Sequence, residues 1–267
     1  MDTTARLRWI AGAVRLTLQE PADGVDRILS RLQALSGRAH AADYEPEPDW
    51  EEHLHSLLGR PWPCPARAEF EQVWSRIEAV LEAKRLAFGR GTYGGWDDAD
   101  PALGRAVWCL TRHLRPSVVV ETGVARGVTS HVILAALERN GTGRLVSIDL
   151  PALDPALHDQ IAAAVPEDLQ GRWSYVSGPS RRRLPGVLAD LDELELFVHD
   201  SSHTERNVRF ELEHVWPVLR PGGTVVADDV ERSAGFARFR RTVSDGAAVI
   251  ARADDGQALI GFAVKRS

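Results

Sequence analysis

The sequence predicts an α/β protein built on a parallel β-sheet, and two observations support this fold class. Apolar, mostly β-branched runs alternate with amphipathic helical stretches over residues 117–245, which is typical of consecutive strand–helix units. Four of these runs end on a carboxylate, namely at Glu121, Asp149, Asp200 and the pair Asp228-Asp229. Ligands of parallel sheets bind at the carboxyl ends of the strands. We therefore expect these acids to share one edge of the sheet and to serve one site.

The first part of the chain predicts a helical extension. Apolar residues recur at helical spacing over residues 6–38, with Pro21 interrupting the run. Residues 45–65 are rich in proline and predict an irregular connector with one short helix, Trp50–Leu58. Phe70–Phe88 is amphipathic and predicts a further helix. We place a domain boundary near residue 98, which gives an N-terminal helical extension or lid over residues 1–98 and an α/β domain over residues 99–267.

The elements expected in the second domain follow in order along the chain. Helices are expected at Pro101–Leu114 and at 127–138, 155–165, 180–191, 204–219 and 233–245. Parallel strands are expected at Ser117–Glu121 and at 144–149, 173–177, 194–199 and 223–228. The segments Ala247–Ala253 and Ala258–Lys265, joined by a turn at Asp254–Gln257, predict an antiparallel hairpin. A parallel sheet closed by such a hairpin differs from the plain dinucleotide-binding fold.

Composition excludes several classes of protein. The chain has 267 residues, of which 44% are hydrophobic and 26% charged, as in ordinary globular proteins. Its net charge of −6 argues against nucleic acid as the main partner, and no window approaches the ~18 apolar residues of a membrane span. Two cysteines, Cys64 and Cys109, are too few for a disulfide framework or a zinc site. We therefore expect a cytoplasmic protein that binds neither nucleic acid nor membrane.

The first strand end carries the pattern Glu121-x-Gly123-x-x-x-Gly127 at a strand-to-helix turn. Glycines there allow the backbone to approach a ligand, and the following helix offers free N–H groups. The nicotinamide fingerprint G-x-G-x-x-G is broken by Ala125. Asp149 is placed to accept hydrogen bonds from ribose hydroxyls. The alternative interpretation is that both acids cap helices.

The later strand ends predict the reacting half of the site. Asp200, Asp228 and Asp229 are expected on one edge, where three carboxylates repel one another unless a cation or protons compensate. Oxygen ligands suit Mg²⁺, and a metal lowers the pKa of a bound hydroxyl. His203 follows Asp200 by three residues and is the candidate general base. In the alternative interpretation, Asp200 contacts the cofactor without a metal and Asp228-Asp229 caps the next helix.

Over residues 99–267, including the terminal hairpin, the chain resembles the class I S-adenosylmethionine (SAM)-dependent methyltransferases, which have a Rossmann-like sheet. The resemblance implies that the first loop holds the methionine end of SAM, that Asp149 holds the ribose, and that Ser177-Gly178-Pro179-Ser180 frames the adenine. The implied cofactor-binding residues are Glu121, Gly123, Gly127, Thr129, Ser130, Asp149, Gly178 and Ser180. Arg181–Arg183 stands where the third loop of the family often carries an acid.

The second half resembles the metal-dependent O-methyltransferases of the catechol and antibiotic-sugar types. Those enzymes carry an Asp, an acidic or amide pair about this far downstream, and a base three residues after the first Asp. The resemblance implies metal ligation by Asp200, Asp228 and Asp229, and a base at His203. Ser201 stands where the wider group often has glycine. The implied reaction is Mg²⁺-dependent methylation of a hydroxyl on a small molecule, such as a natural-product sugar.

Three other functions stay open at this point: a metal-independent small-molecule methyltransferase, a nicotinamide oxidoreductase, and a SAM-binding protein without turnover. The N-terminal helices are where we expect substrate specificity or homo-oligomerisation to reside. Tyr93 and Trp96 either form a lid over the ligand or anchor the N-terminal segment. His199, at a strand end, is expected to point into packing or solvent.

Overall fold

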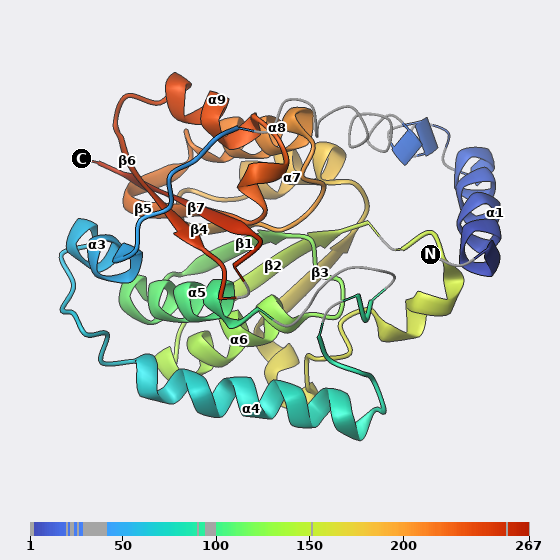
Figure 1. Ribbon diagram of the computed structural model, residues 1–267, viewed down its shortest axis with the longest axis horizontal. Coiled ribbons are helices and arrows are strands. Elements are labelled where there is room, and N and C mark those ends of the chain that lie inside the picture. Colours follow the sequence, from blue (N-terminus) through green and yellow to red (C-terminus); the bar gives the residue numbers. More distant parts are fainter. Residues whose placement is uncertain are drawn as a thin grey trace.

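The computed structural model describes residues 3–19, 21, 24, 25, 27, 28, 42–89, 91–93, 100–150, 152–254 and 256–266. Within these residues the strands form one seven-stranded sheet of order β3-β2-β1-β4-β5-β7-β6. The first five strands pair in parallel, and β7 runs antiparallel to both β5 and β6 (Figure 1). The strands are β1 (Val118–Thr122), β2 (Arg144–Asp149), β3 (Trp173–Ser177), β4 (Leu194–His199), β5 (Leu219–Ala227), β6 (Gly246–Arg252) and β7 (Leu259–Lys265). This topology confirms the predicted parallel sheet with its C-terminal antiparallel hairpin.

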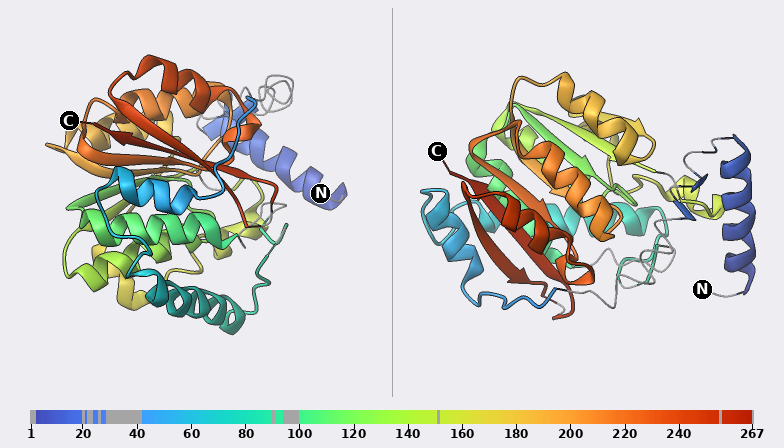
Figure 2. Two further views of the ribbon diagram at one scale, coloured as in Figure 1. Left: turned by 60° about the vertical axis from the view of Figure 1, so that its left-hand side comes forward. Right: turned by 90° about the horizontal axis from the view of Figure 1, so that it is seen from above.

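Helices cover both faces of the sheet (Figures 1 and 2). The helices of one layer are α3 (Trp50–Leu57), α4 (Arg67–Ala83), α5 (Pro101–Leu114) and α6 (Val128–Asn140). Those of the other are α7 (Ser180–Ala189), α8 (Glu205–Val215) and α9 (Gly235–Thr242). Alternate β1 residues serve the two cores, since Val119 packs with the first layer and Val118 and Val120 with the second. A strand whose two faces are both buried explains the uninterrupted apolar run.

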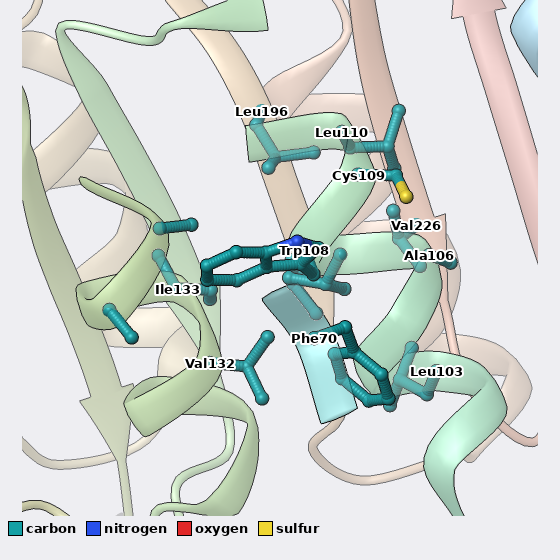
Figure 3. Packing of buried hydrophobic residues seen from close by; sticks show 14 of the residues in the cluster. Phe70, Leu103, Ala106, Trp108, Cys109, Leu110, Val132, Ile133, Leu196 and Val226 are labelled. Carbon is teal, nitrogen blue, oxygen red and sulfur yellow. The ribbon is translucent and has the colours of Figure 1, made fainter. Parts of the chain in front are cut away.

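The first core is centred on Trp108 of α5, whose side chain is fully buried beside Phe70, Val132 and Ile133 (Figure 3). Its indole Nε1 donates a hydrogen bond to the Ala66 carbonyl at 2.8 Å, which satisfies the one polar atom of the ring. Residues of α3 and α4 belong to this same core cluster. The segment from α3 to α4 therefore packs as part of the α/β body. The domain boundary expected near residue 98 lies outside the described residues.

Helix α1 (Thr3–Gln19) lies at the edge of the molecule, beside the loop that follows β2 (Figure 2). Arg8 pairs with Asp154 there at 3.0 Å. Several apolar side chains of α1 are exposed, including Leu7 at 63% and Leu18 at 79%. Residues 29–38 of the expected long helix lie outside the described residues. None of the described helices is long and apolar enough to cross a bilayer.

The helices predicted over 155–165 and 70–88 end five residues earlier than expected, for backbone reasons. The helix predicted over 155–165 is a 3₁₀ helix, η2 (Pro155–Gln160), followed by a turn at Ala162 with φ of 57°. The Ala162 and Ala164 amides donate to the carbonyls of Ala125 and Arg126 at 2.9 and 2.8 Å. Because these two amides donate to the loop after β1, they are not available for the hydrogen bonds of a longer helix. Similarly, α4 ends at Ala83 because Arg85 adopts a left-handed φ of 57°.

Two further short 3₁₀ helices lie between the main elements. They are η3 (Glu167–Arg172), which leads into β3, and η4 (Val230–Arg232), which follows β5.

Candidate functional site

The register of the central strands aligns the predicted acids along one edge. Thr122 at the end of β1 pairs with Ile148 of β2 and His199 of β4, and His199 pairs with Ala227 of β5. The next residues along β2, β4 and β5 are Asp149, Asp200 and Asp228. The Asp200 amide donates to the Thr122 carbonyl at 2.8 Å, and the Asp228 amide to the His199 carbonyl at 2.9 Å. The acids therefore meet at the carboxyl edge, as the alternation predicts.

The glycines of the first loop are required by the protein's own packing. Gly123 has φ of 88°, and a Cβ there would lie 1.9 Å from the Asp200 carbonyl oxygen. Gly127 has φ of 81°, and a Cβ would lie 2.8 Å from a Val165 methyl group. Both values of φ are left-handed, where glycine is favoured. The loop therefore packs directly against the end of β4, which brings the first and reacting halves of the site together.

Glu121 is fully buried beneath this loop. Its Oε2 accepts hydrogen bonds from Ser130 Oγ and Ser147 Oγ, both at 2.7 Å. Its Oε1 is buried and has no hydrogen-bond partner among the described residues. Burial raises the pKa of Glu121 to about 7, against the opposing effect of the two serine hydroxyls. Ser130, predicted as a cofactor residue, lies in the structure as a buried support for Glu121.

Asp149 is half-buried at the end of β2. Burial raises its pKa, while the Arg27 guanidinium and the backbone N–H groups of Leu150, Ala125 and Val124 oppose the shift. Arg27 also donates to the Leu150 carbonyl at 2.8 Å. A basic residue of the N-terminal extension thus lies beside the predicted ribose acceptor. The sequence pattern did not indicate this contact, because Arg27 is 122 residues from Asp149 along the chain.

The remaining predicted cofactor residues line the same edge. The Gly178 amide donates to the Asp149 carbonyl at 2.8 Å, which ties the loop after β3 to the end of β2. Ser180 begins α7, and its Oγ lies 3.4 Å from Asn207 Oδ1. Thr129 is half-buried in the first turn of α6.

Arg126, in the loop after β1, binds the segment that contains Ala87, Thr92 and Tyr93. Its side chain is buried, donates to the Thr92 carbonyl and to Gln160 Oε1 at 2.7 Å each, and also donates to the Ala87 carbonyl. Its guanidinium lies 5.6 Å from the centroid of the Tyr93 ring. Tyr93 is itself 5% exposed. Tyr93 is therefore anchored against the first loop, and Trp96 lies outside the described residues.

Asp200 and Asp228 crowd one another. Burial raises the pKa of Asp200 well above its usual range, and the carboxylates of Asp228 and Asp229 raise it further. Burial and Asp229 raise the pKa of Asp228 in the same way. A bound cation or a shared proton relieves such repulsion. This half of the edge fits an oxygen-ligated cation in its donor chemistry.

Asp229 is oriented differently from the other two acids. It adopts a left-handed φ of 52°, and its Oδ2 lies 2.9 Å from Arg232 Nε and 3.4 Å from His203 Nε2. Among the described residues, one group of three potential metal ligands has its ligand atoms within 4.8 Å of one another, and it consists of His55, Cys64 and His113. Asp200, Asp228 and Asp229 do not form such a group. The three carboxylates therefore do not converge as a set in this structure.

His203 lies between Asp229 and the end of β4. Burial lowers its pKa well below the usual range, and His199 and Arg232 lower it further. The Nε2 contact with Asp229 favours a proton on Nε2, and Nδ1 is buried without a hydrogen-bond partner among the described residues. His203 is therefore a neutral imidazole near neutral pH, the form that can accept a proton.

A buried polar network supports this loop, and sequence analysis missed it. Glu211 of α8 is fully buried and accepts hydrogen bonds from His199 Nδ1 at 2.6 Å and Thr122 Oγ1 at 2.5 Å. It also accepts from Ser201 Oγ at 2.8 Å and Asn207 Nδ2 at 2.9 Å. His199 thus points into the protein onto a carboxylate. The expected alternatives were packing or solvent, and the signal for the network was only a lone Glu on the apolar face of α8.

Comparison with known proteins addresses the family. Residues 120–230 match a protein-family model described as "Methyltransferase domain". Over these residues the chain is similar to that family. The match spans the strand ends at Glu121, Asp149, Asp200 and Asp228, so the aligned acids lie within it. The comparison with curated proteins found no match to this chain.

Solved structures of O-methyltransferases share the fold of this chain. The O-methyltransferase from Bacillus cereus in complex with SAH is 18% identical, with 72% of this chain and 91% of that chain covered and a TM-score of 0.54. The O-methyltransferase TomG from Streptomyces achromogenes, involved in tomaymycin synthesis and solved with SAM, is 15% identical. It covers 83% of this chain and 100% of its own, with a TM-score of 0.52. At these identities the likeness establishes the class I methyltransferase fold.

Proposed function

We propose that this protein is a SAM-dependent O-methyltransferase that acts on a hydroxyl group of a small molecule. The observation that carries the proposal is the row of acids at the ends of β2, β4 and β5, within a methyltransferase domain. The broken glycine spacing and the antiparallel hairpin disfavour a nicotinamide cofactor. The likeness to SAM- and SAH-bound O-methyltransferases supports the choice of donor and of acceptor atom.

The first half of the edge is proposed to hold SAM. Asp149 would accept hydrogen bonds from the ribose hydroxyls, and Gly178 and Ser180 would frame the adenine. The unpartnered Glu121 Oε1 would attract the ammonium group of the methionine end, because a buried carboxylate oxygen without a donor is costly. The first turn of α6, with Gly127 and Thr129, would offer backbone N–H groups to the carboxylate.

The second half is proposed to bind Mg²⁺ through Asp200 and Asp228, with Asp229 as the third oxygen donor. A bound Mg²⁺ lowers the pKa of a substrate hydroxyl and fixes its position. His203 would accept the hydroxyl proton as the oxygen attacks the methyl group in line with the sulfur. Positioning and deprotonation are what such a transfer requires of the protein.

Metal-independent transfer is the second candidate, and one observation favours it. Asp229 Oδ2 already contacts Arg232 and His203, so charge on this edge is partly compensated within the protein. In that case His203 and the crowded acids alone would deprotonate the hydroxyl.

We propose a hydroxylated natural product, such as an appended sugar, as the acceptor, consistent with the role of TomG in tomaymycin synthesis. The exposed apolar side chains of α1 support self-association through the N-terminal helices, which the oligomeric state in solution would test.

The decisive experiment follows SAM conversion to S-adenosylhomocysteine with a panel of catechols and sugar-bearing acceptors, with Mg²⁺ or with EDTA. We expect turnover with Mg²⁺, loss in EDTA, and loss in Asp228→Asn while SAM still raises the melting temperature. Asp192→Asn, an exposed acid before β4, is the matched control. Full turnover in EDTA would support the metal-independent candidate. Absence of any thermal shift with SAM would contradict the proposed function.

A further inference from the structure

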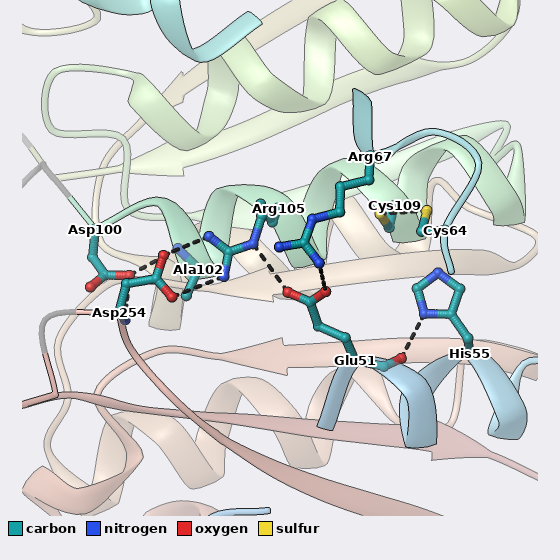
Figure 4. A network of polar contacts seen from close by, with 9 residues as sticks. All are labelled: Glu51, His55, Cys64, Arg67, Asp100, Ala102, Arg105, Cys109 and Asp254. Carbon is teal, nitrogen blue, oxygen red and sulfur yellow. Dashed lines mark hydrogen bonds and ion pairs between the residues drawn. The ribbon is translucent and has the colours of Figure 1, made fainter. Parts of the chain in front are cut away.

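Four side chains that commonly bind metals meet where α3 and its following loop pack against α5. Cys64 Sγ lies 2.8 Å from Cys109 Sγ and 3.3 Å from His113 Nε2. The His55 ring lies against that of His113, with their centroids 5.2 Å apart. His55, Cys64 and Cys109 are all buried, and Figure 4 shows the two thiols beside the His55 ring.

The local structure explains why these residues converge. Cys109 and His113 are four residues apart on α5 and therefore share one face of that helix. His55 is in the last turn of α3. Glu51 of α3 pairs with Arg105 of α5 at 3.1 Å and with Arg67 of α4 at 3.0 Å (Figure 4). These ion pairs fix α3 and the loop carrying Cys64 against α5.

His55 is arranged as metal-binding histidines usually are. Its Nδ1 lies 2.7 Å from the Glu51 carbonyl oxygen, so Nδ1 carries the proton and Nε2 carries the lone pair. The residue is 2% exposed, and Nε2 has no hydrogen-bond partner in the described part of the chain. A backbone carbonyl that fixes the tautomer and aims the other nitrogen is the usual support of a metal-bound imidazole.

We propose that His55, Cys64, Cys109 and His113 bind a structural Zn²⁺ ion. The ligand atoms of His55, Cys64 and His113 already lie within 4.8 Å of one another, and Cys109 contacts Cys64. Two thiolates and two imidazoles form a ligand set typical of tetrahedral zinc, whereas Mg²⁺ and Ca²⁺ prefer oxygen. The sequence offered only two cysteines, and the two histidines complete the set only in the fold.

His55, Cys64 and His113 need only small side-chain movements to bind one ion. Cys109 Sγ contacts Cys64 but lies outside their group, so the Cys109 side chain must turn towards the ion. Zinc bonds of about 2.3 Å to sulfur and about 2.0 Å to nitrogen place tetrahedral S and N ligands about 3.5 Å apart and two S ligands about 3.8 Å apart. The Cys64–His113 distance of 3.3 Å is close to the first value. The thiols, at 2.8 Å, must separate by about 1 Å. Cys109 and His55 line a small cavity between α3, α4 and α5, which gives Cys109 room to rotate.

The position of the cluster indicates a structural role. His113 is in the last turn of α5, which leads into the amino end of β1 at Val118. The methyltransferase site lies at the opposite, carboxyl end of β1, beyond Thr122. A zinc ion here would join α3, its following loop and α5 into one unit, and its binding energy would add to folding stability. The proposal is therefore independent of the proposed function.

The test is the zinc content of the full-length protein, purified without chelator from zinc-supplemented cells. We expect about one zinc ion per chain in the wild type, and none in Cys64→Ser or His113→Ala. His53→Ala is the matched control, because His53 is exposed on the same helix and pairs with Glu47. The control should keep its zinc. A chelator should lower the melting temperature of the wild type and the control but leave that of both variants unchanged.

Cobalt(II) substitution tests ligation even if the variants fail to fold. The zinc-free wild type should gain a thiolate-to-cobalt charge-transfer band, and added zinc should remove it. Absence of both bound zinc and a cobalt band would overturn the proposal. So would a Cys64–Cys109 disulfide in the mass of the unreduced native protein, since a disulfide removes both thiolates.

Discussion

Replacing Glu211 with alanine should destabilise the protein strongly, because this carboxylate is the centre of the buried network under the loop that follows β4. It is fully buried and accepts hydrogen bonds from four groups, on His199, Thr122, Ser201 and Asn207. Alanine would leave these donors without their acceptor in a region closed to water. His199, itself fully buried, would lose the partner of its Nδ1.

The expected loss follows from these contacts. Each of the four buried donors left unsatisfied costs about 1–3 kcal/mol. Local relaxation reduces the sum, so we expect Glu211→Ala to lower the free energy of unfolding by about 4 kcal/mol. At about 2–4 °C per kcal/mol for a domain of this size, the melting temperature should fall by about 8–16 °C.

Glu211→Gln is the matched control, since it keeps the shape and one acceptor but removes the charge. Burial raises the pKa of Glu211, but His199, Ser180 and Thr122, which hydrogen-bond to the carboxylate, outweigh burial, so the pKa is lowered from 4.5. A carboxylate with a depressed pKa stabilises the fold above its unfolded pKa and loses that contribution as pH falls. The stability gap between wild type and Glu211→Gln should therefore be complete at pH 7 and shrink below about pH 4.5.

Equilibrium urea unfolding of the three proteins, followed by circular dichroism at pH 7 and at pH values below about 4.5, measures both quantities. A loss below about 1 kcal/mol in Glu211→Ala would refute the reasoning, because it would mean that the buried donors find other acceptors. If the difference in the free energy of unfolding between wild type and Glu211→Gln widens as the pH falls, the lowered pKa assigned to Glu211 is wrong.

Three further predictions concern the site. The pKa of Glu121 is raised to about 7, so wild-type stability should fall as pH rises from 4.5 towards 7. Between pH 5 and pH 8, the free energy of unfolding of Glu121→Gln should therefore rise relative to that of the wild type by up to about 3 kcal/mol, as melting curves at the two pH values would show. An equal difference between the two proteins at both pH values would contradict this. Asp149→Ala should lose most of the thermal shift that SAM causes, and a shift with NADH but not SAM would reject the cofactor. His203→Ala should slow single-turnover methyl transfer by ~10²–10⁴-fold while SAM binds normally, and a wild-type rate would exclude His203 as the base.

Local sequence pattern determined the sheet and the edge where the site lies. The apolar run at β1 and the acids at Asp149, Asp200 and Asp228 were sufficient, because burial on both faces and the parallel connection follow from residue type and spacing. The start of α5 was equally local, since the Asp100 side chain accepts from the Ala102 amide at 2.9 Å and caps the helix before Pro101.

One helix range was wrong because distant carbonyl groups competed for its backbone donors. The helix expected over 155–165 ended early because Ala162 and Ala164 donate to the first loop. Helix propensity does not record this competition, because it describes only hydrogen bonds within the segment itself.

By itself, then, the sequence determined which strands form and which acids meet at their ends. Only the tertiary structure decided what each side chain contacts. Glu211 meets Thr122, and Cys64 meets Cys109 and His113, across 89, 45 and 49 residues of chain. These distances depend on how helices pack across the sheet, which spacing along the chain does not encode. Asp229 meets His203 at 3.4 Å in the same way, because the pairing of β4 with β5 brings the loops after these two strands together.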